Sequence, residues 1–353
     1  MIQSIRVVGA GLIGTSIGLK MKSLGCKVEI IDTDTNSMKL AQDLVKSEKL
    51  SEPELIIIAV SVDANAKVVI EQLNANPNSI VCDLASVKSD LLLQVDKLSA
   101  HPENFVSLHP MAGREVNGAE NSRADLFEGR AWIGISDSLK NKKNNEIIES
   151  FVSGCGGVLY WLTSKEHDET VALLSHLPQI LSSLLASKLN DVDPNKLNLA
   201  GQGLRDVTRL AASDAKLWAQ ILISNKDSIQ PLLKDFIASL TKLQDSLNST
   251  NQDQVAAILN RGITGKARIP GKHGAKNRDY SFLPIVIDDK PGQLASIFNE
   301  CAKADVNIED LSIEHSPGQE TGLITLSLSA QDCEKLSEHL ISKGFRVHPT
   351  KNR

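Results

Sequence analysis

A histidine that follows a run of apolar residues, His109, is the side chain of this sequence best placed for chemistry. It comes directly after Phe105 to Leu108, a run typical of a buried strand, and about 100 residues after a glycine-rich pattern. In an open α/β sheet, ligands bind outside the carboxyl ends of the strands, so a histidine there faces the ligand. An imidazole titrates near neutral pH and can act as the general base of a hydride transfer. Taken alone, His109 is equally compatible with a loop histidine that is only hydrogen-bonded in place.

The glycine-rich pattern is Gly9-Ala10-Gly11-Leu12-Ile13-Gly14, between a predicted strand and a predicted helix. The first glycine allows a tight turn, the second lets a pyrophosphate approach the backbone, and the third lets helix and strand pack closely. Asp32 ends the second predicted strand, where a carboxylate accepts hydrogen bonds from ribose hydroxyls and repels a 2′-phosphate. The pattern therefore favours NAD over NADP, with Asp34 as the alternative ribose contact. The expected cofactor-binding residues are Gly9, Gly11, Leu12, Ile13, Gly14 and Asp32.

Three further segments carry polar groups that can converge with His109. Ser86 follows the predicted strand at Ile80 to Cys82, so it is expected at the same edge of the sheet. His176 lies on an apolar helix, where a hydrogen-bonded core histidine is the alternative. Arg205 stands beside a glycine pair, and a capped helix start with surface charges is the alternative there.

Composition limits the classes of function. The 353 residues are 41% hydrophobic and 23% charged, which is ordinary for a soluble globular protein of two or three domains. A net charge of -5 argues against nucleic-acid binding as the main role. Five widely spaced cysteines form no zinc pattern, so we expect reduced, buried thiols and no metal. The sequence shows neither a signal peptide nor an apolar run of roughly 20 residues, which predicts a cytoplasmic protein outside the membrane.

The elements that position these residues fall into successive parts. Short β-branched runs alternate with amphipathic stretches over residues 1–161, which predicts a Rossmann-type parallel sheet that binds a dinucleotide. Residues 162–262 are expected to be all helical and to form the substrate and dimerisation domain, starting from a capping box at Thr163 and Glu166. Pro178 predicts a kink beside His176. The strand-like runs are Ile5 to Val8, Val28 to Ile31, Leu55 to Val60, Ile80 to Cys82, Phe105 to Leu108, and Ala131 to Ile135.

A basic, glycine-containing stretch at 263–280 is expected to be a linker. Residues 281–353 then follow the order strand, helix, strand, strand, helix, strand, which predicts a ferredoxin-like α+β domain.

Taken together, these segments resemble the prephenate dehydrogenase family, which includes members that use arogenate. The resemblance runs through nearly the whole chain and rests on ordered motifs at family-like spacing. The motifs are the Gly9 to Gly14 pattern, Ser86-Val87-Lys88, His109-Pro110-Met111-Ala112-Gly113, Leu126-Phe127-x-Gly129, Ser175-His176-Leu177-Pro178, and Leu204-Arg205-Asp206 with Thr208-Arg209. The segment from residue 283, with Asp289-Lys290-Pro291-Gly292-x-Leu294, resembles an ACT domain, the amino-acid-sensing module of some members.

The resemblance implies an NAD-dependent oxidative decarboxylation of prephenate in tyrosine biosynthesis. It implies that His109 is the catalytic base, that Ser86 hydrogen-bonds the same substrate hydroxyl, and that Arg205 binds a substrate carboxylate. His176 lines the pocket by the same analogy. Arg114 stands where many members have threonine, and it would add a cation near the dianionic substrate.

The resemblance also implies regulation and assembly. The turn with Asp289, Pro291 and Gly292 is expected to bind an amino-acid effector, with tyrosine the most economical ligand, or to serve dimer stability alone. Apolar stripes in the helical region and the resemblance both predict a homodimer. The alternatives are an arogenate dehydrogenase, which differs only in the substrate side chain, a β-hydroxyacid dehydrogenase, and a non-catalytic amino-acid sensor. The sensor has no need of a base such as His109.

Overall fold

The computed structural model describes residues 2–113, 116–269, 281–314, 320–349 and 351–352. The chain divides into two compact units, Met1–Ser249 and Thr250–Arg353. The helix α12 (Gln252–Ala267) falls in the second unit, whereas the sequence predicts most of its residues as part of the helical middle domain.

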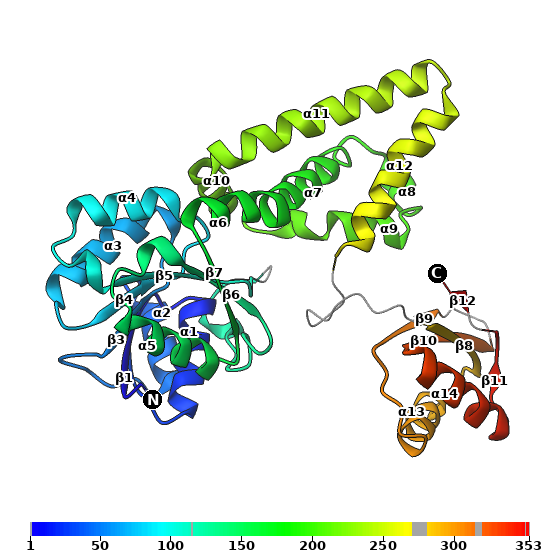
Figure 1. Cartoon of the computed structure of the whole chain (residues 1–353), viewed down its shortest axis with the longest axis horizontal. Helices are drawn as coiled ribbons and strands as arrows, with labels where there is room; N and C mark the ends of the chain where they lie inside the picture. Colours follow the sequence, from blue (N-terminus) through cyan, green and yellow to red (C-terminus); the bar gives the residue numbers. More distant parts are fainter. Residues whose placement is uncertain (1, 114–115, 270–280, 315–319, 350, 353) are drawn as a thin grey trace. The chain divides into compact units, whose positions relative to one another are not determined.

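A seven-stranded sheet with the order β2-β1-β3-β4-β5-β6-β7 organises the first half of the first unit. Successive side chains of a strand point to opposite faces, so Val7 and Val8 belong to two different hydrophobic cores. Figure 1 shows α3 and α4 over one face and α1, α2 and α5 over the other. The strands are β1 (Ser4–Val8), β2 (Lys27–Ile31), β3 (Leu55–Ile58), β4 (Ile80–Asp83), β5 (Phe105–Pro110), β6 (Ala131–Ile135) and β7 (Val158–Leu162). The helices are α1 (Leu12–Ser23), α2 (Thr35–Val45), α3 (Val62–Ala75), α4 (Ser89–Leu98) and α5 (Lys143–Gly154).

The sheet is parallel from β1 to β5, as the sequence predicts, but not throughout. β6 runs antiparallel to β5, with His109 opposite Ile133. The prediction of a wholly parallel sheet is therefore wrong for this pair, because the described residues between the two strands form no crossover α-helix, and a parallel connection needs one. β7, which is parallel to β6, was not among the predicted strands and forms the sheet edge.

The helical part of the first unit begins as predicted. The side chain of Thr163 accepts a hydrogen bond from the Glu166 N–H, and the Glu166 carboxylate accepts one from the Thr163 N–H, which completes the capping box. The irregularity expected at Pro178 takes the form of a π-helical turn, η4 (Ala172–His176), between α6 (Ser164–Val171) and α7 (Leu177–Ser187). Proline cannot donate a backbone hydrogen bond, so a wider turn just before it relieves the clash.

Among the described residues, Ser164–Ser187 is the one helical stretch long and apolar enough to cross a membrane by length and composition. It carries His167, Asp168 and His176, which are buried in a polar network described below. The remaining helical elements of this unit are α8 (Pro194–Leu197), α9 (Gln202–Thr208), η5 (Arg209–Ala212), α10 (Ala215–Ser224) and α11 (Lys226–Asn248).

The second unit contains an antiparallel sheet with the order β11-β8-β10-β9, and β12 also pairs with β8. This strand order and the βαββαβ sequence are those of the predicted ferredoxin-like fold. A core that includes Ile285, Ile297 and Leu336 joins the sheet to its two helices. The elements are β8 (Ser281–Asp288), α13 (Gln293–Lys303), β9 (Asp310–Glu314), β10 (Thr321–Leu328), α14 (Ala330–Ser342), β11 (Arg346–Val347) and β12 (Lys351–Asn352).

The predicted linker is wrong at its start. α12 continues through Ala267, so residues 263–267 are helical. A single glycine such as Gly265 costs a helix only about 1 kcal/mol, which the flanking helix formers can offset. Residues 270–280 lie outside the described part of the chain.

Candidate active site

A cavity of about 520 Å³ lies in the first unit, at the carboxyl edge of its sheet. One wall is the glycine turn with Gly11, Leu12 and Ile13, and the opposite wall comes from the helical part, with His176 and Trp218. Between them lie residues that follow β3 and β4 or end β5. These include Ser61, Ser86, His109 and Pro110. The cavity therefore joins the predicted nucleotide-binding turn to the predicted catalytic residues.

The glycine turn has room for a pyrophosphate. Gly9 has a φ of +114°, and a Cβ there would overlap the carbonyl oxygen of Ala59. A Cβ on Gly14 would overlap the carbonyl oxygen of Gly9, so this glycine permits the close helix–strand packing. Gly11 lines the cavity, and a Cβ added there would meet no atom within 4 Å in the described part of the chain. The turn thus fits the phosphates of a dinucleotide.

Asp32 connects the end of β2 to this turn. Its carboxylate accepts a hydrogen bond from the Ala10 N–H at 2.6 Å and another from the Asp34 N–H at 2.8 Å. The Asp34 side chain instead caps α2 by accepting from the Ser37 N–H at 2.7 Å, and this bond lowers the pKa of Asp34. A carboxylate has about four lone-pair positions, so Asp32 keeps acceptor capacity for ribose hydroxyls.

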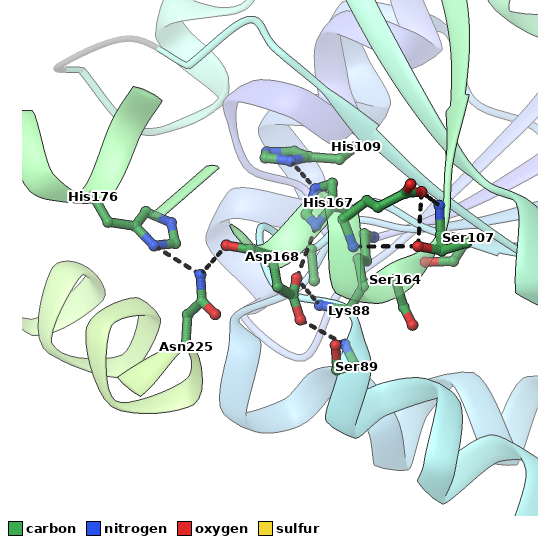
Figure 2. A network of polar contacts seen from close by, with 12 residues as sticks. Lys88, Ser89, Ser107, His109, Ser164, His167, Asp168, His176 and Asn225 are labelled. Atoms are coloured by element: carbon green, nitrogen blue, oxygen red, sulfur yellow. Dashed lines mark hydrogen bonds and ion pairs between the residues drawn. The ribbon is translucent and has the colours of Figure 1, made fainter. Parts of the chain in front are cut away.

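His109 is the fifth residue of β5, because the strand continues to Pro110 rather than ending at Leu108. Its Nδ1 lies 2.8 Å from Nε2 of His167, and Nδ1 of His167 lies 2.8 Å from a carboxylate oxygen of Asp168. Figure 2 shows this row of side chains running from the strand end into α6. The three residues form one hydrogen-bonded series, which we call the His109 row.

Burial keeps the two imidazoles of this row neutral. Burial lowers the pKa of His109 well below its usual value, and His167 and Lys88 lower it further. Burial also lowers the pKa of His167, although its bond to Asp168 offsets part of that effect. Both imidazoles are therefore neutral near pH 7. If Asp168 accepts from His167 Nδ1, then His167 Nε2 accepts from His109 Nδ1, which leaves the lone pair of His109 on Nε2.

Asp168 is held as an anion by the start of α4. Its two carboxylate oxygens accept hydrogen bonds from the backbone N–H groups of Lys88 and Ser89, each at 2.9 Å. Burial alone would raise the pKa of Asp168, but the hydrogen bonds from His167 and Ser89 outweigh it and the pKa is lowered. A carboxylate at the N-terminus of a helix is also favoured by the helix dipole.

Below His109, Lys88 and Asp83 form a fully buried ion pair of 2.8 Å. The Lys88 ammonium also donates to the carbonyl oxygen of Leu108 at 2.7 Å, and Asp83 accepts hydrogen bonds from Asn65 and Ser107. Burial lowers the pKa of Lys88, and Asp83 offsets part of that effect. This pair fixes the backbone directly before His109.

His176 faces the same cavity from the π-helical turn. Its Nδ1 lies 3.1 Å from the amide nitrogen of Asn225, and its ring meets Trp218 edge-on at a centroid distance of 5.9 Å. Burial is the main cause that lowers the pKa of His176, to about 4. His176 is therefore neutral near pH 7.

The structure brings Ser86, His109 and His176 to one cavity. It does not bring Arg205 there: this side chain is exposed on α9, and its Nη2 lies 3.5 Å from the carbonyl oxygen of Ala200 in the same segment. Arg114 lies outside the described residues, directly after Gly113, which lines the cavity.

Sequence reasoning assigned no role to four buried residues near the cavity, although one of them belongs to the Ser86-Val87-Lys88 motif. They are His167, Asp168, Lys88 and Asn225. A signal was present for the first. His167 stands four residues before Val171, on the apolar side of α6, where an unpartnered imidazole would be costly. Asp168 and Asn225 gave no such signal, because their partners come from distant segments.

Comparisons with known proteins identify the family to which the chain belongs. The family model described as "Prephenate dehydrogenase, nucleotide-binding domain" matches residues 11–161, and "Prephenate dehydrogenase, dimerization domain" matches residues 163–261. The Streptomyces niveus protein named "Probable prephenate dehydrogenase NovF" is 27% identical, with 95% of this chain and 96% of the relative covered. The prephenate dehydrogenase of Bacillus subtilis is 24% identical, with 97% and 96% covered.

Solved structures share the fold. The prephenate dehydrogenase of A. aeolicus, solved with hydroxyphenyl propionate and NAD+, has a TM-score of 0.69 at 24% identity and covers 76% of this chain and 99% of its own. The Synechocystis arogenate dehydrogenase has a TM-score of 0.64 at 22% identity and covers 75% and 99%.

Proposed function

We infer the activity of this chain from the premise that it belongs to the prephenate dehydrogenase family, whose two domain models together match most of it. The chain is an NAD-dependent oxidoreductase that converts prephenate to 4-hydroxyphenylpyruvate with loss of carbon dioxide, a step of tyrosine biosynthesis. The observation that carries the mechanism is the His109 row, which leaves a basic nitrogen at the cavity.

The cofactor site is the glycine turn together with Asp32. Bound at this turn, NAD would supply the hydride acceptor for the carbon that carries the substrate hydroxyl. Gly11 leaves the space that the pyrophosphate requires, Leu12 and Ile13 line the cavity beside it, and Gly9 and Gly14 permit the turn itself. Asp32 would hold the ribose hydroxyls, as its position after β2 supports.

We assign the role of general base to His109. Its Nε2 accepts the hydroxyl proton as the hydride departs, because its Nδ1 is engaged with His167. Ser86 lines the same cavity and would hydrogen-bond the same hydroxyl. The anionic Asp168 stabilises the positive charge that develops on the two imidazoles, as a carboxylate behind a catalytic histidine does.

The proton balance suits a base that can also return its proton. Hydride loss turns the alcohol carbon into a ketone, and departure of carbon dioxide from the opposite ring carbon leaves an electron pair that aromatises the ring. The former alcohol oxygen then becomes a phenolate and takes a proton. The lowered pKa of His109 favours return of the proton from its Nε2 to that oxygen.

The substrate carboxylates require donors. His176 can donate from its remaining ring nitrogen into the cavity. Among the described residues that line the cavity there is no lysine or arginine. We therefore keep Arg205 and Arg114 as the candidate cations, the first on the exposed α9 and the second beside Gly113.

One observation keeps arogenate as the second candidate substrate. Asp214 lines the cavity, and one of its carboxylate oxygens caps α10 by accepting from the N–H groups of Lys216 and Leu217. An acidic side chain there suits the ammonium group of arogenate better than the keto acid of prephenate. The NADH produced from each substrate, with NAD and with NADP, tests the assignment. Higher kcat/KM for arogenate would transfer the specificity to the second candidate.

We propose that the domains are 1–161, 162–262 and 281–353, and that the last is an ACT domain. Its ferredoxin-like strand order supports this, as does the turn before α13, where Gly292 has a φ of +89°. Asp289, Pro291 and Gly292 would bind tyrosine at this turn. Calorimetry of the whole chain with tyrosine, phenylalanine and tryptophan tests this, and the absence of binding at millimolar concentration would leave a structural role.

We also propose a cytoplasmic homodimer. All five cysteines are free and buried, which suits a reducing compartment. Several large apolar side chains of the helical part are mostly exposed, including Leu174 at 68%, Ile223 at 70% and Ile237 at 62%. Such a surface favours a partner subunit. Sedimentation of the whole chain tests the dimer, and a monomer at micromolar concentration would contradict it.

A further inference from the structure

Asn225 occupies a buried junction that the proposed mechanism does not use. It lies between α10 and α11 and is 3% exposed. Its amide nitrogen is 2.8 Å from the main-chain carbonyl oxygen of Asp168 and 3.1 Å from Nδ1 of His176. Figure 2 shows this amide between the two residues. One side chain therefore connects the α10–α11 junction to both α6 and the cavity wall.

These contacts determine which way the amide points. A carbonyl oxygen can only accept a hydrogen bond, so the group that faces Asp168 must be the amide nitrogen and not the amide oxygen. The same nitrogen then donates its second hydrogen to Nδ1 of His176. Nδ1 is therefore the unprotonated nitrogen of that ring, and in the neutral imidazole the proton must be on Nε2.

We propose that Asn225 is a positioning residue that holds His176 as a neutral Nε2–H donor at the cavity, where it binds an acceptor oxygen of the substrate. This inference rests on the proposed function for the identity of the substrate. It assigns opposite hydrogen-bonding roles to two imidazoles of one cavity. His109 presents a lone pair for the hydroxyl proton, and His176 presents a hydrogen for a carboxylate or keto oxygen.

Asp168 links the two assignments. Its carboxylate orients the His109 row through His167, and its carbonyl oxygen orients His176 through Asn225. The contacts of the Asp168 carboxylate are expected to affect kcat, because they orient the general base His109. The contacts of the Asp168 carbonyl oxygen are expected to affect KM, because they orient His176, which binds the substrate. The two effects are separable by experiment.

The first test reads the tautomer directly. Nitrogen-15 NMR of histidine-labelled, unliganded protein distinguishes a protonated ring nitrogen from an unprotonated one, and loss of a signal pair in His176→Gln assigns the residue. We expect Nε2 to carry the proton and Nδ1 to be unprotonated. A proton on Nδ1 would overturn the proposal. This measurement needs no substrate, so it stands even if the chain is inactive on prephenate, which would overturn the proposed function instead.

The second test uses Asn225→Leu, which keeps the volume but removes the donor. We expect KM for prephenate to rise about tenfold, the equivalent of one hydrogen bond, with kcat within about threefold of the wild type. The matched control is Asn144→Leu. Asn144 is also buried, and its amide donates to a backbone carbonyl, that of Glu103 at 3.2 Å, in a region away from the cavity.

The outcomes separate positioning from simple support of the fold. Similar losses of thermal stability in the two variants, with a raised KM only in Asn225→Leu, would support the proposal. An unchanged KM in Asn225→Leu would overturn it, and so would a fall in kcat as large as the rise in KM. If Asn225→Leu does not fold, Asn225→Ser replaces it in the kinetics, and the wild-type spectrum still decides the tautomer.

Discussion

Nδ1 of His109 lies 2.8 Å from Nε2 of His167, and the two rings meet at an interplanar angle of 65°. His109, on β5, is thus held by His167, on α6. This contact spans the junction between the nucleotide-binding and helical parts of the first unit, so the catalytic group depends on both.

Removal of the histidine behind the base tests this dependence. His167→Phe keeps a ring of similar size but cannot accept a hydrogen bond from His109. We expect kcat to fall at least about tenfold, a part of the total that general-base catalysis supplies, with an unchanged Kd for NAD. His101→Phe is the control. The one hydrogen bond described for the His101 ring is to Glu103, two residues along the chain. Equal kcat in the two variants would remove His167 from the mechanism.

The pH profile tests the charge state. Because burial and then His167 and Lys88 lower the pKa of His109, the base stays unprotonated below the usual histidine pKa of 6.5. We expect kcat/KM to rise with pH through a midpoint below 6.5 and then to level off. A midpoint above 6.5 in the wild type would show that His109 is not the titrating base or is not buried as described.

A double variant tests the contribution of Lys88 to that midpoint. Lys88→Met combined with Asp83→Asn removes both charges of the buried pair, because removal of one alone costs about 3–5 kcal/mol. Loss of the cation stabilises protonated His109, so the midpoint should move to higher pH. A midpoint that stays in place would mean that Lys88 does not contribute to the lowered pKa of His109.

Much of this site could be predicted from the sequence, because the patterns that indicate it depend on residues close together in the chain. The glycine spacing, the alternation of apolar residues and the Thr163–Glu166 capping box all depend on neighbours in the chain. The direction of β6 relative to β5 could not be predicted, since a short apolar run such as Ala131 to Ile135 is compatible with either a parallel or an antiparallel neighbour.

The hydrogen bonds around the base could not be predicted either, because they join residues that are far apart in the sequence. Asp168 reaches backbone N–H groups 79 and 80 residues away, and Asn225 reaches a carbonyl 57 residues away. Backbone groups leave no mark on the sequence, so these partners become visible only in the folded chain.

Cofactor choice is expected to depend on Asp32. Asp32→Ser should weaken NAD more than NADP, because it removes the ribose acceptor and the charge that repels a 2′-phosphate. Asp34→Ala is the control: it loses the hydrogen bond that caps α2 and so lowers stability, without a change in the preference for NAD over NADP. A wild-type chain with higher kcat/KM on NADP would contradict the assignment.

The resemblance to the family predicts that Arg205 binds a substrate carboxylate. Its exposed side chain, which does not line the cavity, indicates that it does not support the fold. Arg205→Ala should raise KM by the equivalent of a charge-assisted hydrogen bond, about 1.5–3 kcal/mol, with a small change in Tm. Arg209→Ala provides the comparison, because Arg209 directly precedes Leu210 at the cavity wall. A larger rise in KM for Arg209→Ala would move the carboxylate site to that residue.

The most direct test of the account is the turnover of His109→Asn with prephenate and NAD. Asparagine retains a polar side chain but cannot accept the hydroxyl proton as a base. We predict that kcat falls by about 10²–10⁴-fold or more while the Kd for NAD is unchanged. A variant that turns over prephenate at near the wild-type rate would contradict the assignment of His109 as the base.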